Sequence, residues 1–298
     1  MTYSIVARDP QTGRFGVAVQ SHYLGVGATV PWLEAGVGAI ATQASVNISY
    51  GPIGLEMLRA GRSAEEVLAG LVAGDPQAQI RQLGVVDPSG RAAAHTGADC
   101  IPACGHLVGD GFTVQGNLLE RESCWPAMAG AYQSAMAEGV PFVERLLRAM
   151  EAAEAEGGDV RGRQSAAIMV VSADLQPAPW RGRLMDMRIE DHPDPVPELR
   201  RIVTMQLAYD LLDEEGDAAR AGQSTAERYQ RARQMSPDAY ELVFWRGVEL
   251  STSGDVEAGR RELQIAFDAD RRWRTTLEHL AAAGREGVTP ELAAVLLA

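Results

Sequence analysis

The sequence predicts an α+β fold over residues 1–194, followed by a smaller all-α domain over residues 195–298. Strand-like segments come in pairs that are separated by pairs of helix-like segments. This order favours mixed antiparallel sheets covered by paired helices over a doubly wound parallel sheet. Beyond the proline-rich segment 192–197 the strand patterns end, and the remaining segments are typical of helices.

The first predicted elements are two strands joined by a turn. Tyr3–Ala7 and Phe15–Val19 are apolar, and the Asp-Pro-Gln-Thr-Gly segment between them has the residues that turns prefer. A third, glycine-rich strand is expected over residues 36–42. A second hairpin is expected from residues 81–87 and 91–95, which flank Pro-Ser-Gly.

Helices are expected between and after these hairpins. Residues 54–60 form the first, and Ser63 with Glu66 predicts a capping box at the start of the second. Two more are expected over residues 123–138 and 141–156. A last pair of strands is expected over residues 164–172 and 184–190, and Gly111–Val114 is a further strand.

The C-terminal region contains a weak repeat. Phe244–Leu250, a Gly-Asp pair at residues 254–255 and Ala266-Phe267 resemble the tetratricopeptide pattern of helix, turn and helix. An imperfect copy with Gly-Asp at residues 216–217 precedes it. We therefore expect a small helical-repeat domain, with an ordinary helical bundle as the alternative.

Composition excludes several classes of function. The formal net charge is −13, and an acidic surface repels nucleic acid and anionic membranes. All 27 basic residues are arginine, so enzymes that need a Schiff-base lysine or a P-loop lysine are excluded. The three cysteines do not form a disulfide framework, and the chain begins without an apolar leader. We expect a cytoplasmic protein without a cofactor.

Thr2 is the first candidate catalytic residue. Removal of Met1 would leave Thr2 as the amino terminus, at the start of a core strand. An α-amine titrates near neutral pH and can accept the proton of the neighbouring hydroxyl, which replaces a lysine or histidine base.

Polar residues after predicted strands are the other candidates. Gln115 and Asn117 follow residues 111–114 and offer amide N–H groups for an oxyanion, with a turn as the alternative. Two further segments offer substrate contacts, with strand-end hydrogen bonding or a solvated loop as the alternatives. Their candidate residues are Gln43, Ser45, Asp159, Arg163, Gln164 and Ser165.

His95, Cys100, Cys104 and His106 form the one cluster of metal-ligand residue types. Their spacing does not match a structural zinc pattern, so we expect no metal. A cysteine nucleophile is a further alternative, although buried cysteines that pack as small apolar residues are more common.

Several of these segments together resemble the domain of unknown function 1028 family, which is grouped with the N-terminal-nucleophile (Ntn) hydrolases. The resemblance spans residues 1–194 and rests on segments 2–10, 36–44, 50–54, 81–87, 105–106, 115–117 and 158–167. It implies a four-layer αββα sandwich, Thr2 as nucleophile, and amide-bond hydrolysis. The C-terminal region resembles an accessory domain that is sometimes labelled peptidoglycan-binding.

The sequence thus predicts an Ntn hydrolase that acts on a small amide, ureide or peptide C–N bond. Thr2 would be the nucleophile, and Gln115, Asn117 or a backbone N–H would hold the oxyanion. Substrate contacts would come from Gln43, Ser45, His106, Asp159, Arg163, Gln164 and Ser165. The alternative is a non-catalytic binding or scaffold protein whose helical tail docks a partner or a cell-wall peptide. We expect a homo-oligomer, with no nucleic acid or membrane partner.

Overall fold

The computed structural model describes residues 2–213 and 216–298. Met1, whose removal the Thr2 hypothesis requires, lies outside the described residues. The chain divides into two compact units, one ending at Ile202 and one formed by Val203–Ala298, and each is treated separately below. The division falls inside helix α5 (Pro195–Asp210), whose start coincides with the predicted domain boundary.

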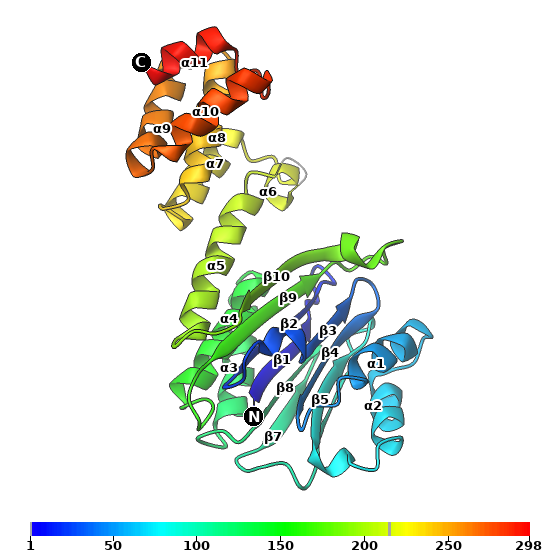
Figure 1. Cartoon of the computed structure of the whole chain (residues 1–298). Coiled ribbons are helices and arrows are strands. Elements are labelled where there is room, and N and C mark those ends of the chain that lie inside the picture. The colour runs from blue at the N-terminus through cyan, green and yellow to red at the C-terminus, as the bar shows by residue number, and fades with distance from the viewer. Residues whose placement is uncertain (1, 214–215) are drawn as a thin grey trace. The chain divides into compact units, whose positions relative to one another are not determined.

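Two antiparallel sheets form the centre of the N-terminal unit (Figure 1). The six-stranded sheet has the order β10-β9-β2-β1-β8-β7. Its strands are β1 (Thr2–Arg8), β2 (Phe15–Ser21), β7 (Gly105–Gly109), β8 (Phe112–Asn117), β9 (Ser165–Val171) and β10 (Arg183–Ile189). The four-stranded sheet has the order β3-β4-β5-β6. Its strands are β3 (Pro31–Glu34), β4 (Gly38–Ala44), β5 (Arg81–Val86) and β6 (Ala92–Thr96).

Each sheet contacts its own pair of helices. Helices α1 (Tyr50–Arg59) and α2 (Ala64–Ala73) contact the four-stranded sheet. Helices α3 (Cys124–Ala137) and α4 (Phe142–Ala155) contact the six-stranded sheet. Three short 3₁₀ helices connect these elements: η1 (Val26–Ala28), η2 (Ala78–Ile80) and η3 (Pro179–Gly182).

The two sheets also contact each other, through side chains that alternate in direction along the strands. On β4, Ala39 and Ala41 belong to an apolar cluster shared with Val17 and Val19 of β2. Ile40, between them, packs in a second cluster that includes residues of α1 and α2. Since successive strand side chains point to opposite faces, Ala39 and Ala41 point toward β2 while Ile40 points toward α1 and α2.

The predicted hairpins, the paired helices and the capping box of Ser63 and Glu66 are confirmed. The prediction that Gln115 and Asn117 follow a strand ending at Val114 is wrong, as is the alternative of a turn, because both residues lie within β8. Their backbones pair with β1, so β8 continues through Gly116 to Asn117. Strands β3 and β7 were not predicted.

In the C-terminal unit, the regular elements among the described residues, 203–213 and 216–298, are all helices. These are the end of α5, then α6 (Asp217–Arg220), α7 (Thr225–Met235), α8 (Tyr240–Thr252), α9 (Val256–Ala269), α10 (Arg272–Ala283) and α11 (Pro290–Leu297). The proline-rich segment 192–197 is partly helical, because Pro195 and Pro197 lie in the first turn of α5. Proline is tolerated there, since the first N–H groups of a helix have no intrahelical partner.

The helix, Gly-Asp turn and helix predicted in the tail correspond to α8, residues 254–255 and α9, where Asp255 caps α9 through the N–H of Ala258. The earlier Gly-Asp pair is followed only by the short α6. Within the described residues, no helix combines the length and the apolar content needed to cross a membrane.

Candidate active site at the start of the first strand

Four polar residues lie in a row across neighbouring strands of the six-stranded sheet, at the end of the sheet where β1 and β9 begin and β2 and β8 end. Ser165 begins β9 and pairs with Ser21 at the end of β2. Thr2 begins β1 and pairs with Asn117 at the end of β8. The register of β1 with β2 places Thr2 beside Ser21, and the Thr2 hydroxyl donates to Ser21 Oγ at 3.1 Å. All four residues are buried.

The face of the row follows from the next residues of β1. Ser4 Oγ donates to Gln43 Oε1 of β4 at 2.6 Å, so even-numbered residues of β1 face the four-stranded sheet. The hydroxyl of Tyr3 donates to Glu154 of α4, so odd-numbered residues face the helices. Thr2 therefore lies at the end of the layer between the two sheets.

Two carboxamides hold the backbone of Thr2. Gln43 Nε2 donates to the Thr2 carbonyl oxygen at 3.2 Å, and Asn117 Nδ2 donates to the same oxygen at 3.4 Å. Both amides also donate to Gln82 Oε1 of β5, each at 2.8 Å. The start of β1 is thus fixed to strands of both sheets.

Gln115 lies deeper in the same layer. It pairs with Ser4 in the β1–β8 register and donates from Nε2 to Ser4 Oγ at 2.6 Å. Its Oε1 is buried and has no hydrogen-bond partner within the described part of the chain. A Cβ at Gly84 of β5 would lie 2.5 Å from this oxygen, so a glycine at that position allows the two sheets to approach.

Asp159 connects the loop after α4 to the end of β2. Its Oδ2 accepts the backbone N–H of His22 at 2.9 Å, and its Oδ1 accepts the backbone N–H of Arg161 at 3.0 Å. The guanidinium of Arg161 adds an ion pair at 2.8 Å. Asp159 is buried, and these N–H groups occupy both of its oxygens. Its carboxylate therefore fixes the backbone of His22, the residue that follows Ser21.

The other predicted substrate-binding residues have separate partners. Arg163 forms ion pairs with Glu154 and Asp194, and Gln164 donates to Asp191. Ser45 is exposed beyond the end of β4. His106 Nδ1 lies 2.8 Å from Thr96 Oγ1, and burial lowers the pKa of this histidine. The structure therefore brings Thr2, Asn117, Ser165, Gln43 and Gln115 together. His106 is connected to this group through Thr96, whose Oγ1 also accepts from Gln82 Nε2 at 2.9 Å. Arg163, Gln164 and Ser45 lie in other hydrogen-bonding groups.

The cysteines have a different environment from that of a nucleophile. Burial raises the pKa of Cys100, Cys104 and Cys124, which favours the protonated thiol. Among the described residues, no group of three or more histidine, cysteine or acidic side chains is arranged to hold a metal ion.

Sequence reasoning missed Ser21, Ser4 and Gln82. The predicted hairpin contained the signal for Ser21, because antiparallel pairing of Arg8 with Phe15 places Ser21 opposite Thr2. Gln82 had no local signal. Its hydrogen bonds with Gln43 and Asn117 form because the two sheets lie close together, and no short sequence pattern predicts that contact.

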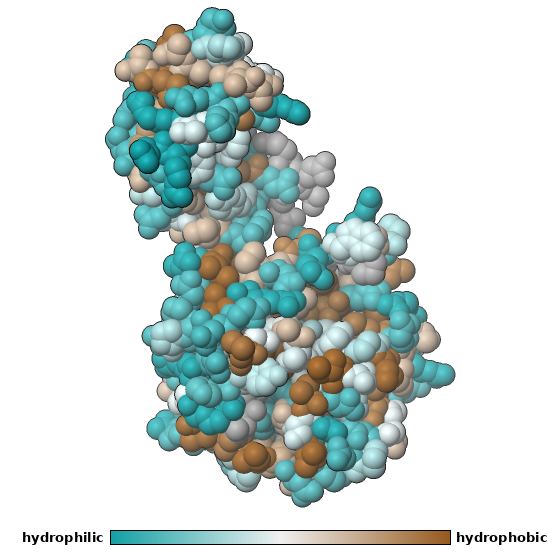
Figure 2. Space-filling model, in the orientation of Figure 1, coloured by the Kyte–Doolittle hydropathy of each residue, from teal (hydrophilic) through white to brown (hydrophobic). Residues whose placement is uncertain are grey.

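Several large apolar side chains that follow the ends of these strands are exposed to solvent. Tyr23 and Leu24 follow β2, Val46 and Ile48 follow β4, and Val160 follows Asp159. Over the visible face of the N-terminal unit, brown side chains form separate spots among teal and white ones (Figure 2).

Comparison with known proteins places the N-terminal unit in context. A family model described as a family of unknown function (DUF1028) matches residues 2–199. A crystal structure of a DUF1028 protein from Silicibacter pomeroyi is similar to this chain, with 32% sequence identity and a TM-score of 0.60. The match covers 73% of this chain and 91% of that chain. No curated protein matches.

Proposed function

The chain belongs to the DUF1028 family, and from that premise we propose that its N-terminal unit is an Ntn-hydrolase-like αββα sandwich with Thr2 as nucleophile. The contacts of α1 and α2 with one sheet, and of α3 and α4 with the other, support the four-layer arrangement. The hydrogen bond from the Thr2 hydroxyl to Ser21 is the observation that carries the catalytic part of the proposal.

In the proposed reaction, removal of Met1 frees the α-amine of Thr2. The amine accepts the hydroxyl proton as Oγ1 attacks the carbonyl carbon of a small amide or peptide. The proton then passes to the leaving nitrogen, and the C–N bond breaks to give an ester on Thr2. Water, deprotonated by the same amine, hydrolyses this ester and restores the hydroxyl.

The environment of Thr2 suits a fixed nucleophile. Gln43 and Asn117 anchor its carbonyl oxygen, so the hydroxyl is held by strand pairing and by two amide hydrogen bonds. Such fixation reduces the entropy that must be lost on reaching the transition state. Ser21 Oγ can orient the Thr2 hydroxyl and relay its proton, which partly replaces the lysine that this chain lacks.

The oxyanion donor is best assigned to a backbone N–H. The side-chain amide of Asn117 donates to Thr2 and Gln82, and that of Gln115 donates to Ser4. Using the Asn117 amide for an oxyanion would break an existing buried hydrogen bond, at a cost of about 1 to 3 kcal/mol, and the Gln115 amide lies deeper, beside Ser4. In the register of β1 with β8, Asn117 lies directly opposite Thr2, whereas Gln115 lies opposite Ser4. Asn117 is therefore nearer to Thr2 than Gln115 is.

Two measurements test the proposal. Intact mass of the purified protein shows whether Met1 is removed, and a β-lactone probe that acylates hydroxyl nucleophiles measures reactivity without knowledge of the substrate. We expect a processed chain, one added probe per chain, loss of labelling in Thr2→Ala, and retained labelling in the matched control Thr2→Ser. Full labelling in Thr2→Ala, or labelling of a chain that keeps Met1, would refute the mechanism.

For the C-terminal unit, the pairing of α8 and α9 through the Gly-Asp turn supports a tetratricopeptide-like arrangement. Repeats of this kind expose a concave surface for binding.

A further inference from the structure

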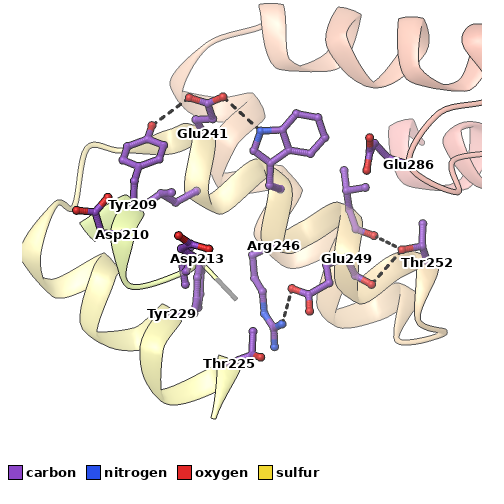
Figure 3. A pocket seen from close by; sticks show the side chains of 14 residues that line it. Tyr209, Asp210, Asp213, Thr225, Tyr229, Glu241, Arg246, Glu249, Thr252 and Glu286 are labelled. Atoms are coloured by element: carbon purple, nitrogen blue, oxygen red, sulfur yellow. Dashed lines mark hydrogen bonds and ion pairs between the residues drawn. The ribbon is translucent and has the colours of Figure 1, made fainter. Parts of the chain in front are cut away.

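A cavity of about 700 Å³ lies within the C-terminal unit (Figure 3). Residues four apart on a helix share a face, and this spacing places Glu241, Trp245 and Glu249 of α8 along one wall. Thr225 and Tyr229 of α7 have the same spacing and line another part. The remaining lining residues are Tyr209, Asp210, Leu212, Asp213, Leu242, Arg246, Val248, Thr252 and Glu286.

The described residues that line this cavity carry an excess of negative charge. Five carboxylates contribute, and Arg246 is the one basic side chain among these lining residues. The carboxylates belong to Asp210, Asp213, Glu241, Glu249 and Glu286. A cavity of this composition attracts a cationic ligand and repels an anionic one.

One wall already shows how the cavity holds a guanidinium group. The guanidinium of Arg246 lies 5.7 Å from the ring centroid of Tyr229 and donates to Glu249 at 2.7 Å. An aromatic face and a carboxylate together form a favourable site for a planar cation.

The neighbouring wall has the same chemistry, and within the described part of the chain no basic side chain pairs with its carboxylate, Glu241. Tyr209 donates its hydroxyl to Glu241 at 3.0 Å, and the indole N–H of Trp245 donates to the other oxygen at 3.3 Å. Burial and the neighbouring Glu241 raise the pKa of Tyr209 to about 12, so the phenol stays neutral. Because the Tyr209 hydroxyl and the Trp245 indole are neutral donors, they orient the Glu241 carboxylate without neutralising its charge. An ionised carboxylate also retains acceptor sites for a further donor.

We propose that this cavity binds a peptide segment through an arginine side chain, which lies against Tyr209 and Trp245 and pairs with Glu241. An arginine is favoured over a lysine because its planar guanidinium can stack on an aromatic face while it bonds a carboxylate in the same plane. The volume exceeds that of one side chain and lies within the range of ligand sites, which leaves room for the flanking peptide backbone. The proposal does not depend on Thr2 or on hydrolysis.

The test is calorimetric titration of the full chain with the capped peptide Gly-Arg-Gly-Arg-Gly. The same peptide with citrulline in place of arginine keeps the shape and removes the charge. We expect the citrulline peptide to bind about tenfold more weakly, because the ion pair with the carboxylate becomes a hydrogen bond from an uncharged urea. Equal binding of the two peptides, or no binding of the arginine peptide, would overturn the proposal.

A pair of variants separates this cavity from the general acidity of the chain. Glu241→Gln removes the proposed partner and keeps an oxygen for Tyr209 or Trp245. Glu278→Gln removes the same charge from an exposed position on α10 that does not line the cavity. We expect about tenfold weaker binding only in Glu241→Gln. An equal loss in both variants, or no loss in Glu241→Gln, would show that the peptide binds elsewhere.

Discussion

The hydroxyl of Thr2 donates to Ser21 Oγ at 3.1 Å, where β1 begins and β2 ends. Both side chains are buried and face the layer between the sheets. If Thr2 is the nucleophile, Ser21 Oγ orients its hydroxyl by accepting this hydrogen bond and can relay its proton as Oγ1 attacks. We predict that Ser21→Ala slows acylation of Thr2 by a β-lactone about tenfold, corresponding to about 1.4 kcal/mol of transition-state free energy.

The measurement is the rate of mass increase under single-turnover conditions. Ser253→Ala serves as the control, because Ser253 caps the end of α8 in the other unit. A matching rate in Ser21→Ala and the wild-type protein would show that the hydrogen bond has no part in the reaction. Thermal unfolding of the variant checks that a lost rate is not a lost fold.

The second prediction concerns Gln82, which joins the two sheets. Its Oε1 accepts from Gln43 and Asn117, and its Nε2 donates to the Gly116 carbonyl at 2.8 Å. Gln82→Met keeps the volume but leaves two buried N–H groups without an acceptor. We expect the free energy of unfolding to fall by about 3 kcal/mol, measured by urea titration.

Gln11→Ala is the control for that variant, since Gln11 is exposed in the turn after β1. Its free energy of unfolding should change by less than about 0.5 kcal/mol. A similarly small change in Gln82→Met would mean that water replaces the lost acceptor, and that the two sheets do not depend on this carboxamide.

Local patterns were sufficient for most of the N-terminal unit. The hairpins and paired helices were predicted because turn residues, capping residues and apolar periodicity act over a few positions. Ser63 and Glu66, for example, form the expected reciprocal hydrogen bonds at the start of α2. Thr2 became a candidate for the same reason, since the proposed role depends on its place in the chain and on the strand that follows.

The rest of the site depends on contacts that local patterns do not report. Gln115 and Asn117 resembled turn residues, because amide side chains and glycine are common in turns. They lie in a strand because pairing with β1 satisfies the backbone, and the side-chain amides donate to partners on β1 and β5. Arg163 resembled a substrate-binding residue, but its partners Glu154 and Asp194 come from α4 and from the end of the predicted domain.

The third prediction concerns a buried ion pair between Asp9 and Arg145. Arg145 of α4 donates to Asp9 at 2.9 Å, and each side chain is only 2% exposed. Arg145→Met leaves the Asp9 carboxylate buried without its cation. We expect a loss of about 3 to 5 kcal/mol in the free energy of unfolding, measured in urea. The double variant Asp9→Asn with Arg145→Met should recover part of this loss, because it also removes the unpaired charge; no recovery would assign the loss to packing of Arg145 alone.

The fourth prediction follows from Asp75, which joins the segment after α2 to the loop after β4. Its carboxylate accepts from the backbone N–H of Gln77 at 2.8 Å and from Arg81 Nε at 3.0 Å. Asn47 Nδ2 and the hydroxyl of Tyr50 also donate to it. The Gln77 N–H, followed by the side chains of Arg81, Asn47 and Tyr50, holds the pKa of Asp75 below its ordinary value.

A lowered pKa in the folded state means that the unfolded chain binds the Asp75 proton more readily. The contribution of Asp75 to stability is therefore complete above about pH 4, the ordinary carboxyl value, and is lost as the pH falls below it. Asp75→Asn should lower the melting temperature at pH 7, and its difference from the wild-type protein should shrink steadily below about pH 4. Thermal unfolding by circular dichroism between neutral and acidic pH measures this, with Asp110→Asn at an exposed turn as the matched control. A difference between Asp75→Asn and the wild-type protein that stays constant with pH would contradict the prediction, because it would show that the effect of the substitution does not arise from the ionised carboxylate.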